Sequence, residues 1–277
     1  MNKKILMKKK LGFMQGRLIP SEKKGRIQYF PEKNWKKEIY LANKNNYKYM
    51  EWTMNIENIQ KNPIFFEEKL KDLKNLLKKN EIKIYSITCD FFMQRPFFKL
   101  KKNMYILNIL KRIIKNSQKI GIKYFIIPLV DESSIKNINQ EKLLINKMKK
   151  FKKYLNKNSK ILFEIDYSPS RTVKFIKSFE SSKFGINLDT GDGAGYGYNY
   201  QEDKSYFKYV KNIHLKDKKF KKKTIRLGEG DFDFKSFFEL IKKVNYKGIF
   251  ILQPARPLKK SDENELNLNR KFINKFL

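Results

Sequence analysis

The sequence predicts an α/β fold, a single (β/α)8 barrel that spans residues 1–277 as one domain. Eight short apolar runs alternate with longer, lysine-rich stretches of helical pattern. The apolar runs lack polar alternation, as expected of parallel strands that are buried on both faces. The length of 277 residues suits such a barrel, and no proline- or serine-rich linker divides the chain.

The expected elements follow one another along the chain. The apolar runs, rich in β-branched and aromatic residues, predict strands at Leu11–Met14, Tyr47–Met50, Ile82–Ile87, Tyr124–Val130, Ile161–Ile165, Phe184–Leu188, Val210–Leu215 and Gly248–Leu252. The intervening periodicity predicts helices at Trp35–Asn45, Phe65–Lys79, Met104–Lys119, Glu141–Leu155, Thr172–Ser178, Ser205–Tyr209, Lys235–Val244 and Glu263–Phe276. Gly121, Gly185 and Gly248 are expected just ahead of strands, in the turns that end helices.

The competing fold is an open, doubly wound sheet with a dinucleotide site. That site needs a glycine-rich loop after the first strand, and none follows Leu11–Met14. The glycines between Gly191 and Gly197 come after the sixth expected strand. The sequence therefore favours the closed barrel.

The high net charge is only weak evidence for nucleic-acid binding. The chain carries 63 Lys and Arg against 28 Asp and Glu, a formal net charge of +35. Only eight of the basic residues are Arg, the side chain that phosphates and base edges favour. The lysines are spread along the chain with Asn, Ile, Phe and Tyr, a group whose codons are A/T-rich. Biased genome composition therefore explains the charge better than nucleic-acid binding does.

The sequence is typical of a cytoplasmic protein with no membrane partner. No apolar stretch approaches the roughly 18–20 residues of a membrane span. The basic start, Met1–Lys10, is not followed by the apolar core of a signal peptide. The single cysteine, Cys89, excludes an internal disulfide framework and a cysteine-based zinc site.

Polar side chains end four of the expected strands. Glu164, Asp189, His214 and Gln253 each follow an apolar run, and the first three are separated by two equal intervals of 25 residues. In a barrel, the carboxyl ends of the strands meet at one face, where chemistry is located. Carboxylate oxygens and an imidazole nitrogen suit a divalent ion such as Mn²⁺, Mg²⁺, Co²⁺ or Zn²⁺.

Several motifs appear in order around these residues. They are Met14-Gln-Gly-Arg-Leu, Met50-Glu-Trp, Phe163-Glu-Ile-Asp, Asn187-Leu-Asp-Thr-Gly, Ile213-His-Leu-Lys-Asp and Leu227-Gly-Glu-Gly-Asp-Phe-Asp-Phe. Together they resemble the xylose-isomerase-like TIM-barrel superfamily, the sugar phosphate isomerase/epimerase group, from about Leu11 to Arg256.

The resemblance implies one divalent metal ion held by Glu, Asp, His and Glu. Glu164, Asp189 and His214 match this pattern, but Gln253 stands where many members have the second Glu. An amide oxygen can ligate a metal, whereas an amide cannot act as a general base at neutral pH. A mechanism with one base, Glu164 or another carboxylate, remains open, because the metal can polarise the carbonyl next to the carbon that loses its proton.

The implied function is a metal-dependent isomerase or epimerase acting on a sugar, sugar phosphate or polyol. Glu164 and Lys216 are the expected catalytic residues. Two alternatives stay open: a lyase that dehydrates a keto-sugar or inosose, and a barrel that binds carbohydrate without turnover because of Gln253. The superfamily also contains AP endonucleases, whose three-metal cluster needs several histidines, and this chain has only His214.

The expected partner is a small carbohydrate, anionic or neutral, and the sequence leaves homo-oligomerisation open. Arg17 and Arg256 suit a carboxylate or phosphate, or else pair with Glu22 or Glu51. Phe91, Phe92, Phe97 and Phe98 suit a lid over the barrel or ordinary packing against helices. The full set of expected substrate-binding residues is Gln15, Arg17, Glu51, Asp90, Asp192, Glu229 and Arg256.

Overall fold

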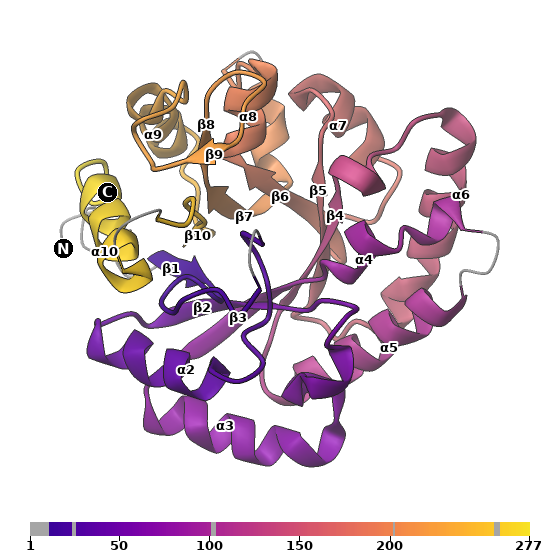
Figure 1. Cartoon of the computed structure of the whole chain (residues 1–277). Helices are drawn as coiled ribbons and strands as arrows, with labels where there is room; N and C mark the ends of the chain where they lie inside the picture. Colours follow the sequence, from indigo (N-terminus) through magenta and orange to yellow (C-terminus); the bar gives the residue numbers. More distant parts are fainter. Residues whose placement is uncertain (1–10, 24–25, 101–103, 202, 258–260) are drawn as a thin grey trace.

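The computed structural model describes residues 11–23, 26–100, 104–201, 203–257 and 261–277, and in it eight parallel strands close into a barrel surrounded by helices (Figure 1). The strand order around the barrel is β1-β10-β7-β6-β5-β4-β3-β2. The predicted (β/α)8 architecture is confirmed. Met1–Lys10, where we expect no signal peptide, lies outside the described residues.

The strands of the barrel lie close to their expected positions. They are β1 (Leu11–Met14), β2 (Tyr49–Thr53), β3 (Lys83–Thr88), β4 (Tyr124–Leu129), β5 (Lys160–Ile165), β6 (Phe184–Asp189), β7 (Val210–Leu215) and β10 (Ile249–Leu252). Two further short strands, β8 (Asp217–Lys218) and β9 (Thr224–Ile225), form a separate antiparallel pair beyond β7.

The helices occupy the expected intervals, except that the short helices α4 (Phe91–Gln94) and α8 (Thr190–Tyr196) are not among the expected ones and one expected helix has another form. They are α2 (Trp35–Lys44), α3 (Leu70–Lys79), α4 (Phe91–Gln94), α5 (Met104–Lys119), α6 (Ile138–Lys149), α7 (Pro169–Ile176), α8 (Thr190–Tyr196), α9 (Phe234–Lys243) and α10 (Asp262–Ile273). The expected helix at Ser205–Tyr209 is wrong as an α-helix, because the segment forms the 3-10 helix Lys204–Lys208. Further 3-10 turns lie at Ile59–Lys61, Pro63–Phe65, Glu67–Lys69, Phe97–Lys99, Asp131–Ser133 and Lys150–Tyr154.

The expectation for Gly185 is also wrong, because this residue lies inside β6 instead of in the preceding turn. A Cβ built on Gly185 would come within 2.9 Å of the Tyr209 carbonyl oxygen and 3.0 Å of a Leu162 methyl carbon. Glycine is therefore needed here for the close approach of neighbouring strands. Gly121 and Gly248 do precede β4 and β10 directly or by a short turn.

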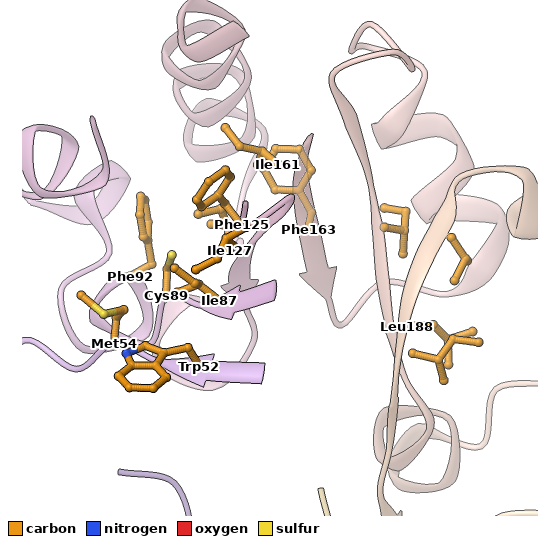
Figure 2. Packing of buried hydrophobic residues seen from close by; sticks show 14 of the residues in the cluster. Trp52, Met54, Ile87, Cys89, Phe92, Phe125, Ile127, Ile161, Phe163 and Leu188 are labelled. Carbon is orange, nitrogen blue, oxygen red and sulfur yellow. The ribbon is translucent and has the colours of Figure 1, made fainter. Parts of the chain in front are cut away.

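Two apolar clusters lie on the two sides of the closed sheet. The larger cluster packs strand residues such as Ile87, Phe125 and Phe163 against the surrounding helices (Figure 2). The smaller cluster comprises Met14, Ile249 and Ile251. Because side chains alternate along a strand, Ile249 and Ile251 share the inward face with Gln253. The barrel interior thus changes from apolar to polar toward the carboxyl ends of its strands.

Phe91, Phe92, Phe97 and Phe98 are at most 5% exposed and belong to the larger cluster. Phe92 contacts Phe91 and Phe97 through ring centroids 5.0 and 5.8 Å apart. These rings are core residues, as the packing alternative expects, and not a lid. Among the described residues, no helix combines the length and apolar character that crossing a bilayer requires.

Candidate active site

Three side chains at the carboxyl ends of adjacent strands converge inside the barrel. Glu164 comes from β5, Asp189 from β6 and His214 from β7. All three are buried, and one potential ligand atom from each lies within 4.8 Å of the others. The structure therefore brings together the three residues whose equal spacing predicted a shared centre.

The imidazole of His214 is held from both sides. Its Nε2 lies 2.7 Å from Glu51 Oε1, and its Nδ1 lies 3.0 Å from Glu164 Oε2. Asn187 Nδ2 donates to the same Glu164 oxygen at 2.7 Å. Burial lowers the pKa of His214, but the carboxylates of Glu51 and Glu164 outweigh this effect and raise the pKa to about 10. Nδ1 of His214 thus lies in direct contact with a carboxylate oxygen of Glu164.

Glu51 lies beneath His214 and is fully buried. Its Oε2 accepts hydrogen bonds from Ser86 Oγ at 2.6 Å and from Asn212 Nδ2 at 3.0 Å, and its Oε1 accepts one from Thr88 Oγ1. Burial raises the pKa of Glu51, but His214 and these donors together lower it by more, so the net shift is downward. A carboxylate that accepts the second ring nitrogen commonly orients a metal-ligating histidine. Glu51 therefore has the surroundings of an orienting residue.

Lys216 lies over Asp189, with its Nζ 2.6 Å from Asp189 Oδ2. The other oxygen of Asp189 accepts the backbone N–H of Gly191 at 2.7 Å. A Cβ at Gly191 would lie 2.6 Å from Lys216 Cδ, so the glycine gives the lysine room to reach the carboxylate. Burial raises the pKa of Asp189, but the charges of Lys216 and His214 lower it by more, so the net shift is downward. Burial lowers the pKa of Lys216, whereas Asp189 and Glu164 raise it above its ordinary value.

Asp192, one turn into α8, is buried beside this pair. Its Oδ1 lies 3.4 Å from Lys218 Nζ. Burial and the nearby charge of Asp189 raise the pKa of Asp192 to about 8. Asp192 thus lies among the charged groups of Asp189, Lys216 and Lys218.

A cavity of about 330 Å³ opens at this face of the barrel. It reaches Glu164 and Lys216, which connects the buried cluster to the outside. Most of the residues that line it are polar, and the full set comprises Arg26, Ile27, Gln28, Asn55, Thr88, Asp90, Met93, Gln94, Pro128, Val130, Asp131, Glu164, Lys216, Lys218, Thr224 and Gln253. This volume lies within the usual range of small-molecule sites.

Gln253 and Asp90 face this cavity and are linked through Gln28. Gln253 Nε2 donates to Gln28 Oε1 at 2.6 Å, and Gln28 Nε2 lies 2.9 Å from each carboxylate oxygen of Asp90. Gln253 Oε1 is buried and has no hydrogen-bond partner among the described residues. Burial raises the pKa of Asp90 to about 7, with Glu164 and Glu51 adding to the effect and Gln28 opposing it.

Other expected substrate-binding residues lie below or beside the cavity. Gln15 is buried and accepts the backbone N–H of Thr53 at 3.0 Å. The buried Arg17 donates to the carbonyl oxygens of Pro254 and Ile27 at 3.1 and 2.5 Å. Burial, together with Arg256, lowers the pKa of Arg17 to about 9.

The remaining two expected residues form ion pairs with neighbouring side chains. Arg256 pairs with Asp262 at 2.7 Å instead of with Glu22 or Glu51. Glu229 is exposed and pairs with Arg226 at 2.9 Å. None of Gln15, Arg17, Glu51, Asp192, Glu229 and Arg256 lines the 330 Å³ cavity of the described chain.

The motifs Ile213-His-Leu-Lys-Asp and Leu227-Gly-Glu-Gly meet through Asp217. Its Oδ2 accepts the backbone N–H groups of Gly228 and Gly230 at 2.8 and 3.0 Å, and its Oδ1 accepts that of Phe232 at 3.3 Å. The carboxylate that follows His-Leu-Lys therefore holds the Leu-Gly-Glu-Gly loop in place.

Sequence reasoning missed four residues of the site. Asn187 and Asn212 lie two positions before Asp189 and His214, so strand alternation could have placed them on the same inward face. Lys218 could have been found by extending the alternation beyond Lys216. Gln28 gave no such signal, because it lies in the irregular connection between β1 and α2.

The chain is similar in fold to several solved structures. One match is the structure of a xylose isomerase domain protein from Planctomyces limnophilus, with 13% identity, a TM-score of 0.71, and coverage of 86% of this chain and 90% of that chain. Another is D-psicose 3-epimerase with D-tagatose from Clostridium cellulolyticum H10, with 11% identity, a TM-score of 0.68, and coverage of 96% of both chains. A third match is a xylose isomerase-like TIM barrel protein from Mycobacterium smegmatis in complex with magnesium, with 14% identity, a TM-score of 0.69, and coverage of 100% of this chain and 98% of that chain.

These structural matches agree in fold at low sequence identity, and no curated protein sequence matches significantly. The family model described as xylose isomerase-like TIM barrel matches residues 39–275. This range covers most of the chain and confirms the resemblance that the motifs indicated. The chain therefore belongs to the xylose isomerase-like TIM barrel family of enzymes.

Proposed function

We propose that the protein is a metal-dependent isomerase or epimerase that moves a proton next to the carbonyl of a sugar or a related polyol. The observation that carries the proposal is the buried convergence of Glu164, Asp189 and His214 at the base of a polar cavity. D-psicose 3-epimerase with D-tagatose and D-allulose 3-epimerase with D-allulose are of the same fold, which supports a ketose as the first substrate to test.

The residues present fit a divalent ion. Glu164, Asp189 and His214 offer two carboxylates and one imidazole, and the unpartnered Oε1 of Gln253 offers an amide oxygen. Mg²⁺ and Mn²⁺ accept such oxygen-rich sets, and Co²⁺ and Zn²⁺ accept the imidazole equally well. A bound ion of this kind would polarise the carbonyl of the substrate.

The protein side chains would then position the sugar and move the proton. Glu164 reaches the cavity and is the proposed base that takes the proton from the carbon next to the carbonyl. Lys216 also lines the cavity and would hold a hydroxyl or anionic group of the substrate. The salt bridge to Asp189 fixes the ammonium group of Lys216 before substrate arrives.

The first prediction tests this function by proton exchange. With D-allulose and D-tagatose in D2O, proton NMR should show loss of the signal of the hydrogen next to the carbonyl. Chelation should abolish the exchange, and added Mn²⁺ should restore it. Glu164→Gln should lower the exchange rate at least about 100-fold, since proton transfer by a positioned group is worth this much. His214→Ala should lower it as well, because the ion that polarises the carbonyl would lose a ligand.

Glu239→Gln is a matched control, because Glu239 is an exposed carboxylate on α9 away from the cavity. It should leave the exchange rate unchanged. A wild-type protein that binds no divalent ion and shows no exchange would contradict the proposal. Sugar binding without exchange would favour the non-catalytic barrel, and a dehydrated keto product would favour the lyase.

A further inference from the structure

Three polar side chains from separate parts of the chain form a hydrogen-bonded series at the cavity wall. Asp90 follows β3, Gln28 lies between β1 and α2, and Gln253 follows β10. Asp90 accepts from Gln28 Nε2 at 2.9 Å through both oxygens, and Gln28 Oε1 accepts from Gln253 Nε2 at 2.6 Å. The main chain of Gln253 is fixed as well, because its N–H donates to the Leu215 carbonyl at 3.0 Å.

The series has a direction that Asp90 sets. An ionised carboxylate only accepts hydrogen bonds, so the amide nitrogen of Gln28 must face Asp90. Asn55 Nδ2 lies 3.4 Å from Asp90 Oδ2 and is a further donor directed at the carboxylate. The amide oxygen of Gln28 then faces Gln253, which must turn its own nitrogen toward Gln28. The oxygen of Gln253 remains on the other side, buried and without a hydrogen-bond partner.

We propose that Asp90, acting through Gln28, is a positioning residue that orients the amide of Gln253 so that its oxygen is offered to the metal centre. The inference rests on the proposed function, since it concerns the same ion. It explains how this chain can use an amide at position 253, where many family members have a carboxylate. A carboxylate at position 253 presents oxygen in either orientation, whereas an amide presents oxygen in only one of its two orientations.

Asp90→Asn should reverse this direction, because Asn55 Nδ2 takes the one remaining oxygen at position 90 and leaves the amide nitrogen for Gln28. The amide nitrogen of an asparagine at position 90 can donate to Gln28 Oε1, which frees Gln28 Nε2 to donate to Gln253 Oε1. The nitrogen of Gln253 would then face the metal centre, and an amide N–H cannot ligate a cation. The affinity for Mn²⁺ should fall about tenfold or more, as commonly follows the loss of a residue that orients a ligand.

The test is a double-mutant cycle on the full chain, with Mn²⁺ affinity measured by titration calorimetry at pH 8, where Asp90 is mostly ionised. The proteins are the wild type, Asp90→Asn, Gln253→Glu and the double variant. In the Gln253→Glu background, Asp90→Asn should change the Mn²⁺ affinity less than about threefold, because a carboxylate needs no such orientation. Thermal unfolding of each variant confirms that it is folded.

Asp131→Asn sets the size of a purely electrostatic loss, because Asp131 also lines the cavity. An equal loss of Mn²⁺ affinity from Asp90→Asn in both backgrounds, or a loss no larger than that of Asp131→Asn, would overturn the positioning role while leaving the proposed function standing. A wild-type protein that binds no Mn²⁺ would overturn the proposed function and this inference together.

Discussion

Glu51 accepts hydrogen bonds from four side chains inside the barrel. Ser86, Thr88 and Asn212 donate to it, and His214 Nε2 lies 2.7 Å away. Because all five side chains are buried, removing the carboxylate would leave donors without an acceptor and without water. The residue therefore supports both the stability of the barrel interior and the orientation of His214.

The second prediction concerns this carboxylate. Glu51→Leu should lower the free energy of unfolding by about 3–5 kcal/mol, because it strands the surrounding donors in a dry interior. Glu51→Gln keeps the shape and one acceptor oxygen, so it should cost roughly half as much. Urea unfolding in the presence of a chelator measures both. Equal losses below about 1 kcal/mol in the two variants would mean that Glu51 contributes little to stability.

At the level of single residues, the sequence predicted the centre of the site better than its wall. Glu164, Asp189 and His214 interrupt apolar strands at regular positions, so their convergence follows from strand geometry alone. Gln28 comes from an irregular connection, and its contact with Gln253 joins positions 225 residues apart. No local pattern encodes such a contact, because it depends on how the closed barrel places its loops.

Helix α2 contributes a buried carboxylate to the connection after β1. Glu38 Oε1 accepts the backbone N–H groups of Gly16 and Leu18 at 2.7 and 3.1 Å. Burial raises the pKa of Glu38 to about 7, although these hydrogen bonds and the charges of Arg256 and Arg17 oppose the shift. The folded protein therefore holds a proton that an unfolded chain releases at lower pH.

The third prediction follows from that difference. Between about pH 4.5 and pH 7 the unfolded state loses the Glu38 proton while the folded state keeps it, so this group lowers stability as the pH rises. The total loss in the free energy of unfolding is roughly 3 kcal/mol. It is fully present above pH 7 and absent below pH 4.5. Glu38→Gln should remove this pH dependence from the free energy of unfolding.

Denaturant unfolding of the wild type and Glu38→Gln from pH 4 to pH 8 measures the effect. Glu68→Gln, which changes an exposed carboxylate in a 3-10 turn, is the control and should follow the wild type. Parallel curves for the wild type and Glu38→Gln would contradict the prediction.

At the level of elements, periodicity located all eight barrel strands and most helices, but it missed the short helices α4 and α8. Helix α8 contains Gly191, Gly193 and Gly195, and glycine disfavours helix formation. The segment is helical because Asp189 caps its first turn and because Lys216 packs where a side chain at Gly191 would lie. Tertiary contacts thus override local propensity at the element that borders the site.

The whole molecule carries an unbalanced charge. Most of the 63 basic residues cannot find an acidic partner among 28 Asp and Glu, and several of the ion pairs that do form are solvent-exposed. Exposed pairs contribute little to stability, whereas excess like charge repels within the folded state. Repulsion between the basic side chains therefore lowers the stability of the folded protein at low ionic strength.

The fourth prediction is that the melting temperature rises by several degrees when NaCl is increased from about 10 to 300 mM. The Debye length falls from about 30 Å at 10 mM salt to below 8 Å, which screens lysine repulsion across the surface. Circular dichroism during heating measures the change, and KCl should reproduce it. A melting temperature that falls with salt would show that the ion pairs outweigh the repulsion.

The contacts around the site also differ in the length of chain they enclose. Asp217 reaches Gly228 across 11 positions, whereas His214 reaches Glu51 across 163. Since the entropy cost of closing a loop grows with its length, the Asp217 loop can assemble while the barrel is still open. Glu51 and His214 meet only when early and late parts of the chain come together. The fixed orientation of the His214 imidazole therefore depends on a closed barrel, because its partner Glu51 lies on β2, a strand from the early part of the chain.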